Sequence, residues 1–227
     1  MPSSAPETVR YASTVPDSRS IALRWPAIAV LLSLCSSLSC GAAPAESSTS
    51  AHACLADGVR YPSQGCGYEV GSVVPNFSFQ GRVAGIDSPV TTVHFADFYD
   101  PDGTKGLRYL LVNATTLWCP YCKGEMLALP GMSADYRARG VRFMTLLLER
   151  ADGSVASQDD VDALIRTYAL DSTVVNDPKE LATLFFAKSS MPLNLIIDLR
   201  TMKIVNKIIG AGASTVRTSI DVALGGS

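Results

Sequence analysis

The sequence predicts an α/β protein, a three-layer sandwich with a central mixed β-sheet. An apolar run at 108–113, a helical stretch at 120–139 and a second apolar run at 141–148 form a βαβ unit. Two extended segments, 193–198 and 203–209, follow as a hairpin, and a helical stretch closes the chain. Hydrophobic residues make up 47% of the 227 residues, which is enough for a substantial core.

The first half of this domain is expected to begin with strands. Residues 74–79 form a short extended piece, and the alternating pattern at 91–99 predicts a strand. Asp100-Pro-Asp-Gly103 predicts a hairpin turn before the buried central strand at 108–113. Pro120 suits the first position of the following helix, which Pro130 should bend and Gly140 should end.

The second half continues with alternating elements. A buried strand at 141–148 precedes an amphipathic helix at 158–168, a short extended piece at 174–175 and a short helix at 180–187. Ser214 is expected to cap a last helix that runs to Leu224. The expected core includes Phe77, Phe79, Phe95, Leu110, Leu146, Leu148, Ile196 and Ile197.

Residues 1–40 have the order of a secretory signal peptide. Arg19 and Arg24 precede an apolar run at 25–38 that is shorter than the roughly 20 residues needed to span a bilayer. The sequence Ser37-Leu-Ser-Cys40-Gly resembles the lipobox of bacterial lipoproteins, which implies a lipid on Cys40. We therefore expect an exported protein, anchored to a bacterial membrane and facing the extracytoplasmic space. Residues 41–69 follow as a flexible tether that holds the Cys54 and Cys66 loop.

The other cysteines fall into pairs. Cys54 and Cys66 lie in the loop before the folded domain, which we assign to residues 70–227, and Cys119 and Cys122 form a C-x-x-C motif. Paired cysteines fit an oxidising compartment. Cys54 and Cys66 are expected to form a structural disulfide, with a relay pair that exchanges with the C-x-x-C as the alternative.

The C-x-x-C motif carries the predicted chemistry. It stands between a strand and a helix, so the sulfur of Cys119 should lie near unpaired N–H groups that favour a thiolate. Such a thiolate attacks a substrate disulfide, and Cys122 then resolves the mixed disulfide. Zinc would need about four ligands, so no metal and no cofactor is expected.

The segment Trp118-Cys-Pro-Tyr-Cys-Lys-Gly-Glu-Met126 resembles the active site of the thioredoxin superfamily, and in particular its TlpA and ResA-like branch. Val74-Pro-Asn-Phe-Ser-Phe-Gln-Gly81 resembles the entry segment of that branch, and Met191-Pro192 matches the family's cis-proline position. The resemblance covers about residues 70–224. It implies a thioredoxin-like fold and thiol–disulfide exchange. It also implies substrate contacts from residues beside the cysteines and in the proline loop, namely Trp118, Pro120, Tyr121, Met191 and Pro192.

The sequence departs from the family at the proton shuttle. Asn113 stands six residues before the first cysteine, where thioredoxins carry a buried aspartate. Glu125 lies three residues after Cys122 on the expected helix and matches the TlpA-like carboxylate, so it is the candidate acid–base residue. The alternative is an exposed glutamate that only favours the helix dipole.

Two other functions stay open at this stage. Thr116-Leu-Trp-Cys119 reproduces half of a peroxiredoxin motif, although Val112 replaces the proline of that motif. A non-enzymatic lipoprotein with a stable disulfide is the second alternative. The net charge of −2 gives no reason to expect nucleic acid as a partner. The expected partners are protein thiols or disulfides, an electron donor in the membrane or periplasm, and the membrane itself.

Overall fold

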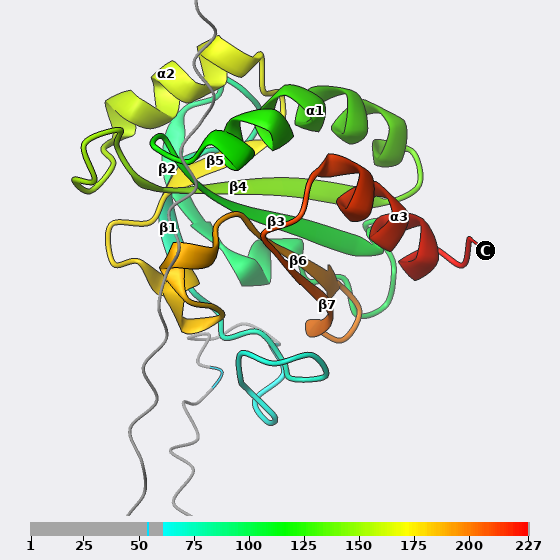
Figure 1. Ribbon diagram of the computed structural model, residues 1–227. Coiled ribbons are helices and arrows are strands. Elements are labelled where there is room, and N and C mark those ends of the chain that lie inside the picture. Colours follow the sequence, from blue (N-terminus) through cyan, green and yellow to red (C-terminus); the bar gives the residue numbers. More distant parts are fainter. Residues whose placement is uncertain (1–53, 55–60, 227) are drawn as a thin grey trace, which may run out of the picture. The chain divides into compact units, whose positions relative to one another are not determined.

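The computed structural model describes Cys54 and residues 61–226 of the chain (Figure 1). The expected signal peptide, Cys40 and most of the tether lie outside these residues. In the part of the chain that is described, no helix is both long and apolar enough to cross a membrane.

Seven strands, three α-helices and three short 3-10 helices make up these residues. In chain order they are β1 (Ser78–Arg82), β2 (Val90–His94), η1 (Phe95–Phe98), β3 (Tyr109–Thr116), α1 (Pro120–Arg137), β4 (Val141–Glu149), α2 (Gln158–Tyr168), β5 (Thr173–Asn176), η2 (Leu181–Leu184), η3 (Lys188–Ser190), β6 (Leu193–Asp198), β7 (Lys203–Ile209) and α3 (Ala213–Ala223).

The strands form one mixed sheet in the order β2-β1-β5-β4-β3-β6-β7. Strands β3, β4 and β5 run parallel, and β6 lies antiparallel to β3 with Ala114 opposite Leu193. The predicted βαβ unit (β3, α1 and β4) and the predicted hairpin (β6 and β7) are both present. The central mixed sheet and the α/β class are confirmed.

The sheet separates two hydrophobic layers. Alternate residues of the buried strands, such as Leu111 and Ile196, join apolar residues of α1, α2 and α3 on one face (Figure 1). The other face is covered by η1 and η2, by Phe185 and by residues of the segment that precedes β1. The second outer layer is therefore built from short turns and loop rather than from α-helices.

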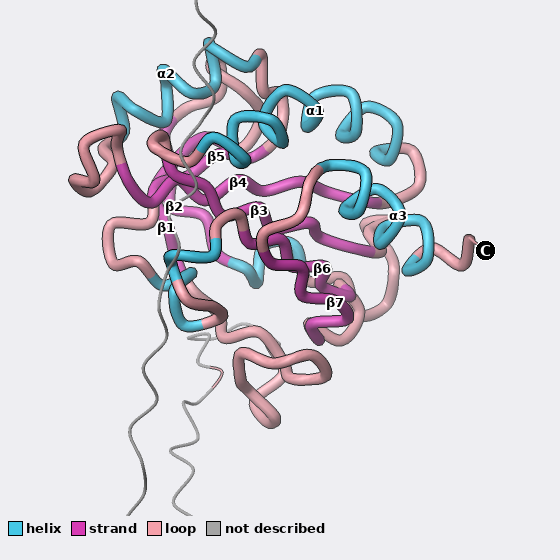
Figure 2. Tube along the Cα trace, viewed as in Figure 1, coloured by secondary structure: helices cyan, strands magenta, loops and turns pink. Residues whose placement is uncertain are grey.

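Residues 61–77, before β1, form a loop (Figure 2) whose last part lies along the edge strand β7. The N–H groups of Gly71 and Val74 donate to the carbonyls of Ile204 and Met202, and the Ile204 N–H donates to Ser72. Part of the exposed edge of β7 is thereby paired, which protects it from other chains.

Four features of the fold differ from the sequence expectation. The strand expected at 91–99 ends at His94, because the His94 N–H donates to the side chain of Asp97 and starts a 3-10 turn. The helix expected at 180–187 is only the turn η2, since the side chain of Asp177 accepts the N–H groups of Leu181 and Ala182. The last helix begins after Gly212, so Ser214 lies inside it and does not cap it.

The fourth difference is the turn after Asp100, which is not a hairpin turn. Strand β2 pairs only with β1, while β3 pairs with β4 and β6. The buried carboxylate of Asp100 instead accepts the N–H groups of Lys105 and Leu107 and so shapes the loop that leads into β3.

Two further expectations need smaller corrections. Helix α1 ends at Arg137, three residues before Gly140, which has a φ of +82° where a Cβ would lie 2.7 Å from the carbonyl oxygen of Gly106. Phe77 is only partly buried at the border of the core.

Candidate active site

Both cysteines of the C-x-x-C lie where β3 passes into α1. Cys119 is the N-cap residue and Pro120 the first residue of the helix. Cys119 and Cys122 form a disulfide, with their Cα atoms 5.3 Å apart. The Cys122 N–H donates to the Cys119 sulfur at 3.1 Å, so this sulfur meets one of the unpaired amides of the first turn.

Burial differs little between the two sulfur-bearing residues. Cys119 is 2% exposed and Cys122 is 0% exposed, whereas Trp118 is 38% and Tyr121 is 77% exposed. Exposure therefore does not decide which cysteine is the nucleophile, but the N-cap position favours Cys119. Trp118 precedes Cys119 and Tyr121 lies between the two cysteines, so both aromatic side chains offer accessible surface beside the disulfide.

Met191 and Pro192 lie directly before β6, the strand that pairs with β3. Their peptide bond is cis, as the sequence match predicts, and Leu193 begins β6 next to the end of β3. Met191 is buried in the hydrophobic cluster that also contains Cys119 and Cys122. The proline loop and the C-x-x-C thus border one apolar region.

Glu125 is buried, in contrast to the exposed first-turn glutamate of the alternative interpretation. Its Oε2 accepts the Asn113 amide at 2.7 Å, and both of its carboxylate oxygens lie 3.1 Å from the Asn194 amide nitrogen. The Asn113 amide also donates to Asn194 Oδ1 at 2.8 Å. Burial raises the pKa of Glu125 above its ordinary value, and the two asparagine hydrogen bonds oppose that rise.

Glu149 was not among the residues singled out from the sequence. It ends β4, and its two carboxylate oxygens accept the Trp118 indole N–H at 2.6 Å and the Lys188 ammonium at 2.6 Å. Burial works against its ionisation, but the Lys188 and Trp118 hydrogen bonds outweigh burial, so the pKa of Glu149 lies below its ordinary value. No local sequence signal points to this contact, because Trp118 and Glu149 are 31 residues apart.

Cys54 and Cys66 form the second disulfide, with their Cα atoms 5.7 Å apart. Its loop is attached to the segment that leads to the cis-proline. Lys207 donates to the carbonyls of Tyr68 and Phe185, and the rings of these two residues lie 5.3 Å apart in an edge-to-face arrangement. The segment that follows Cys66 therefore packs on the folded domain.

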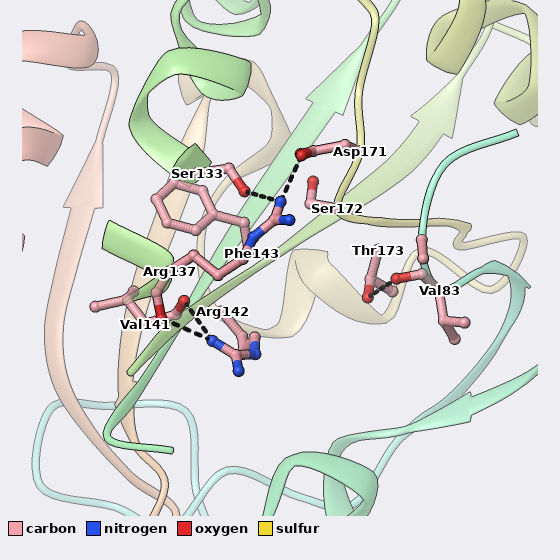
Figure 3. A pocket seen from close by; sticks show the side chains of 10 residues that line it. Val83, Ser133, Arg137, Val141, Arg142, Phe143, Asp171, Ser172 and Thr173 are labelled. Carbon is pink, nitrogen blue, oxygen red and sulfur yellow. Dashed lines mark hydrogen bonds and ion pairs between the residues drawn. The ribbon is translucent and has the colours of Figure 1, made fainter. Parts of the chain in front are cut away.

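A separate pocket of about 220 Å³ lies where β4 and β5 begin, whereas the cysteines follow the end of the parallel strand β3 (Figure 3). The charged side chains that line the pocket already have partners in the protein. Arg137 pairs with Asp171, and Arg142 donates to backbone carbonyls. The pocket contains no cysteine, and we assign it no role in thiol chemistry.

Comparison with known proteins places the fold but not a sequence family. No protein-family model matches the chain, and no curated protein matches it. Solved structures do match. A candidate thiol:disulfide interchange protein DsbE from Chlorobium tepidum is similar with a TM-score of 0.52 and 20% identity, over 69% of this chain and 98% of that one.

Two further structures agree. A thiol:disulfide interchange protein from a Bacteroides species matches with a TM-score of 0.51 and 16% identity, over 70% of this chain and 92% of that one. A secreted thiol-disulfide isomerase from Corynebacterium glutamicum matches with a TM-score of 0.50 and 18% identity, over 70% and 89%. The chain has a thioredoxin-like fold, a fold that it shares with these thiol–disulfide exchange proteins.

Proposed function

We propose that this protein is a thiol–disulfide oxidoreductase that acts through Cys119 and Cys122. The observation that carries the proposal is the Cys119–Cys122 disulfide at the start of α1, with the Cys119 sulfur accepting the Cys122 N–H. A disulfide whose sulfur lies at a helix N-terminus is readily reduced, because the thiolate so formed is stabilised there.

In the reducing direction two electrons pass from the dithiol to the substrate. The Cys119 thiolate attacks one sulfur of a substrate disulfide, and the other substrate sulfur leaves as a thiolate. The Cys122 thiol then loses its proton, and its sulfur attacks the Cys119 sulfur of the mixed disulfide. The bond between Cys119 and the substrate breaks, a second substrate thiolate leaves, and the intramolecular disulfide forms. Oxidation of a substrate dithiol follows the same steps in reverse.

Glu125 is the proposed acceptor of the Cys122 proton. It lies one helical turn after Cys122, is buried, and has a raised pKa, all of which suit a carboxylate that exchanges a proton with a thiol. Asn113 holds the place of the usual aspartate but has no acidic proton, so its amide can only orient Glu125.

Trp118, Pro120, Tyr121, Met191 and Pro192 are proposed to contact the substrate. Protein thiols or disulfides fit as substrates, because Trp118 and Tyr121 offer exposed aromatic surface beside the cysteines. We further propose that the protein is exported and anchored through a lipid on Cys40, and that a membrane or periplasmic donor reduces its disulfide.

The test uses the full chain in detergent and follows dithiothreitol-driven reduction of insulin. Wild type should catalyse the reaction, and Cys119→Ser should abolish catalysis. The Cys54→Ser/Cys66→Ser double variant is the matched control, because it removes a disulfide elsewhere and should keep the activity. Consumption of hydrogen peroxide by the same samples tests the peroxidase alternative. Insulin reduction by Cys119→Ser at the wild-type rate would show that Cys119 is not the nucleophile.

A further inference from the structure

Glu149 connects the two walls of the proposed thiol site. One wall is the segment before α1, where Trp118 precedes Cys119. The other is the loop from Lys188 in η3 to the cis-proline Pro192. One carboxylate oxygen of Glu149 accepts from Trp118 and the other accepts from Lys188, both at 2.6 Å. A single carboxylate thus holds both walls through separate oxygens.

The main chain adds a further contact between Glu149 and the first wall. The Leu117 N–H donates to the Glu149 carbonyl at 2.9 Å, just after β3 ends at Thr116 opposite Glu149. Glu149 is therefore fixed to the segment before the cysteines by backbone and side chain together. Its position at the end of a buried strand makes it a rigid support.

Burial makes this arrangement energetically demanding. Glu149 is 7% exposed, so its carboxylate needs partners for its charge and for both oxygens. Lys188 supplies the counter-charge and Trp118 the second hydrogen bond. Lys188 also pairs with Glu180 at 2.8 Å.

We propose that Glu149 and Lys188 are positioning residues, an inference that rests on the proposed function. They hold the Trp118 wall and the 188–192 loop at a fixed relative position. A disulfide in an extended polypeptide can then bind between the two. A small disulfide reaches the sulfur of Cys119 without spanning both walls. The Glu149–Lys188 pair should therefore affect the binding of polypeptide substrates and leave the reaction of small disulfides nearly unchanged.

The experiment compares Glu149→Gln, Glu149→Ala and Lys188→Met with the conservative variant Lys188→Arg and with the control Glu180→Gln. Trp118 and Lys188 bind different oxygens of Glu149, and Gln replaces one of these oxygens by an amide donor and removes the charge that pairs with Lys188. Glu180→Gln removes the other partner of Lys188 and leaves both contacts of Glu149 intact. All variants are made in the full chain.

Kinetics provide the first measurement. The KM for insulin should rise about tenfold in Glu149→Ala and Lys188→Met, which corresponds to about 1.4 kcal/mol. The rate with bis(2-hydroxyethyl) disulfide should stay close to that of wild type. In Lys188→Arg the KM for insulin should stay close to that of wild type, because the positive charge is kept. The KM of Glu180→Gln should equal that of wild type. An equal fall in the rates with both substrates, or an unchanged KM for insulin, would overturn the proposal.

The Trp118 indole provides a second, spectroscopic measurement. The sequence has two tryptophans, so Trp25→Phe leaves Trp118 as the only one. In ¹⁵N-tryptophan-labelled protein the indole N–H signal should shift as the Glu149 carboxylate is protonated in acid, and Glu149→Gln should lose that titration. An indole signal that titrates alike with and without Glu149 would overturn the proposed contact. Absence of insulin reduction by wild type would instead count against the proposed function, while the indole signal would still report on the contact.

Discussion

The side-chain amide of Asn113 donates to the buried carboxylate of Glu125 at 2.7 Å, one helical turn beyond Cys122. Asn194 donates to the same carboxylate from the neighbouring strand β6. Burial raises the pKa of Glu125, and the hydrogen bonds from these two neutral amides oppose that rise. This balance leads to the first two predictions.

Replacing Glu125 by Gln should lower the apparent pKa of the cysteine thiols in the reduced protein. The change removes a negative charge that disfavours a nearby thiolate and keeps nearly the same shape. It should also slow the release of a mixed disulfide, because no carboxylate accepts the Cys122 proton. The rate of iodoacetamide alkylation as a function of pH measures the first effect. Asp135→Asn, which removes an exposed carboxylate on the same helix, is the control. Overlapping profiles for Glu125→Gln and wild type would contradict the assigned role.

The raised pKa of Glu125 also makes the free energy of unfolding depend on pH. In the unfolded chain this group ionises around its ordinary value of 4.5, whereas in the folded protein it ionises at higher pH. The folded state therefore binds more protons, and its stability falls as pH rises above that value. Urea unfolding of wild type and Glu125→Gln from pH 4 to pH 8 should show the variant gaining stability relative to wild type. A constant difference over this range would exclude a raised pKa.

Asn113→Asp should destabilise the folded protein at neutral pH. The change places a second carboxylate against Glu125 and removes the amide that donates to both Glu125 and Asn194. A loss of about 3 kcal/mol in the free energy of unfolding is expected at pH 7, since a buried charge loses its partner. Acidification should restore part of the loss as one carboxyl of the pair is protonated. Asn206→Asp, at a partly exposed position of β7, is the control and should change stability little.

The sequence predicts this site only in part, and the limits have physical reasons. Cys119, Cys122 and Glu125 lie within one helical turn or two, so their spacing alone brings them together. Asn194 reaches Glu125 only because β6 pairs with β3, in a register that brings Asn113 opposite Asn194. Such a register is set by the packing of the whole sheet rather than by any local pattern.

The helices and strands are likewise predicted from local patterns, whereas some of their boundaries depend on side-chain contacts. Apolar runs and the βαβ pattern locate the buried strands and α1 because burial requires those patterns. The end of β2 depends instead on Asp97 and Asn76, whose side chains accept the N–H groups of His94 and Ala96. Alternation at 91–99 continues past that point, so hydrophobicity alone extends the strand too far.

Removing the Cys54–Cys66 disulfide by a double change to Ala should lower the stability by about 3 kcal/mol, the value expected for a loop of about a dozen residues. Tyr68, which follows Cys66, keeps its own contacts with Lys207 and Phe185, so insulin reduction should be retained. Urea unfolding measures the first effect. Retained insulin reduction would support a structural disulfide, and loss of turnover in a still-folded protein would favour the relay alternative.

Full-length protein produced in a bacterium that processes lipoproteins should carry an acyl chain on Cys40 and partition into detergent. Cys40→Ser should abolish both properties. Cys35→Ser is a matched control, because Cys35 lies in the apolar run and should be removed with the signal peptide. Mass spectrometry of the N-terminal peptide decides the question. An unmodified N-terminus in the soluble fraction would contradict lipidation.

Cys122→Ser should trap substrates as mixed disulfides, whereas Cys119→Ser should not. The two cysteines are almost equally buried, so the expected difference comes from position and not from exposure.

In Cys122→Ser the backbone N–H of residue 122 remains and can still donate to the Cys119 sulfur, which keeps the thiolate favoured. The attack on insulin then proceeds, but no second thiol resolves the product. In Cys119→Ser the remaining Cys122 thiol lies inside the first turn, three residues before Glu125, whose negative charge disfavours ionisation of the thiol. Non-reducing gels and mass spectrometry after mixing each variant with native insulin should show an adduct on Cys119 alone. An adduct of equal yield on Cys122 in the Cys119→Ser variant would show that the helix position does not select the nucleophile.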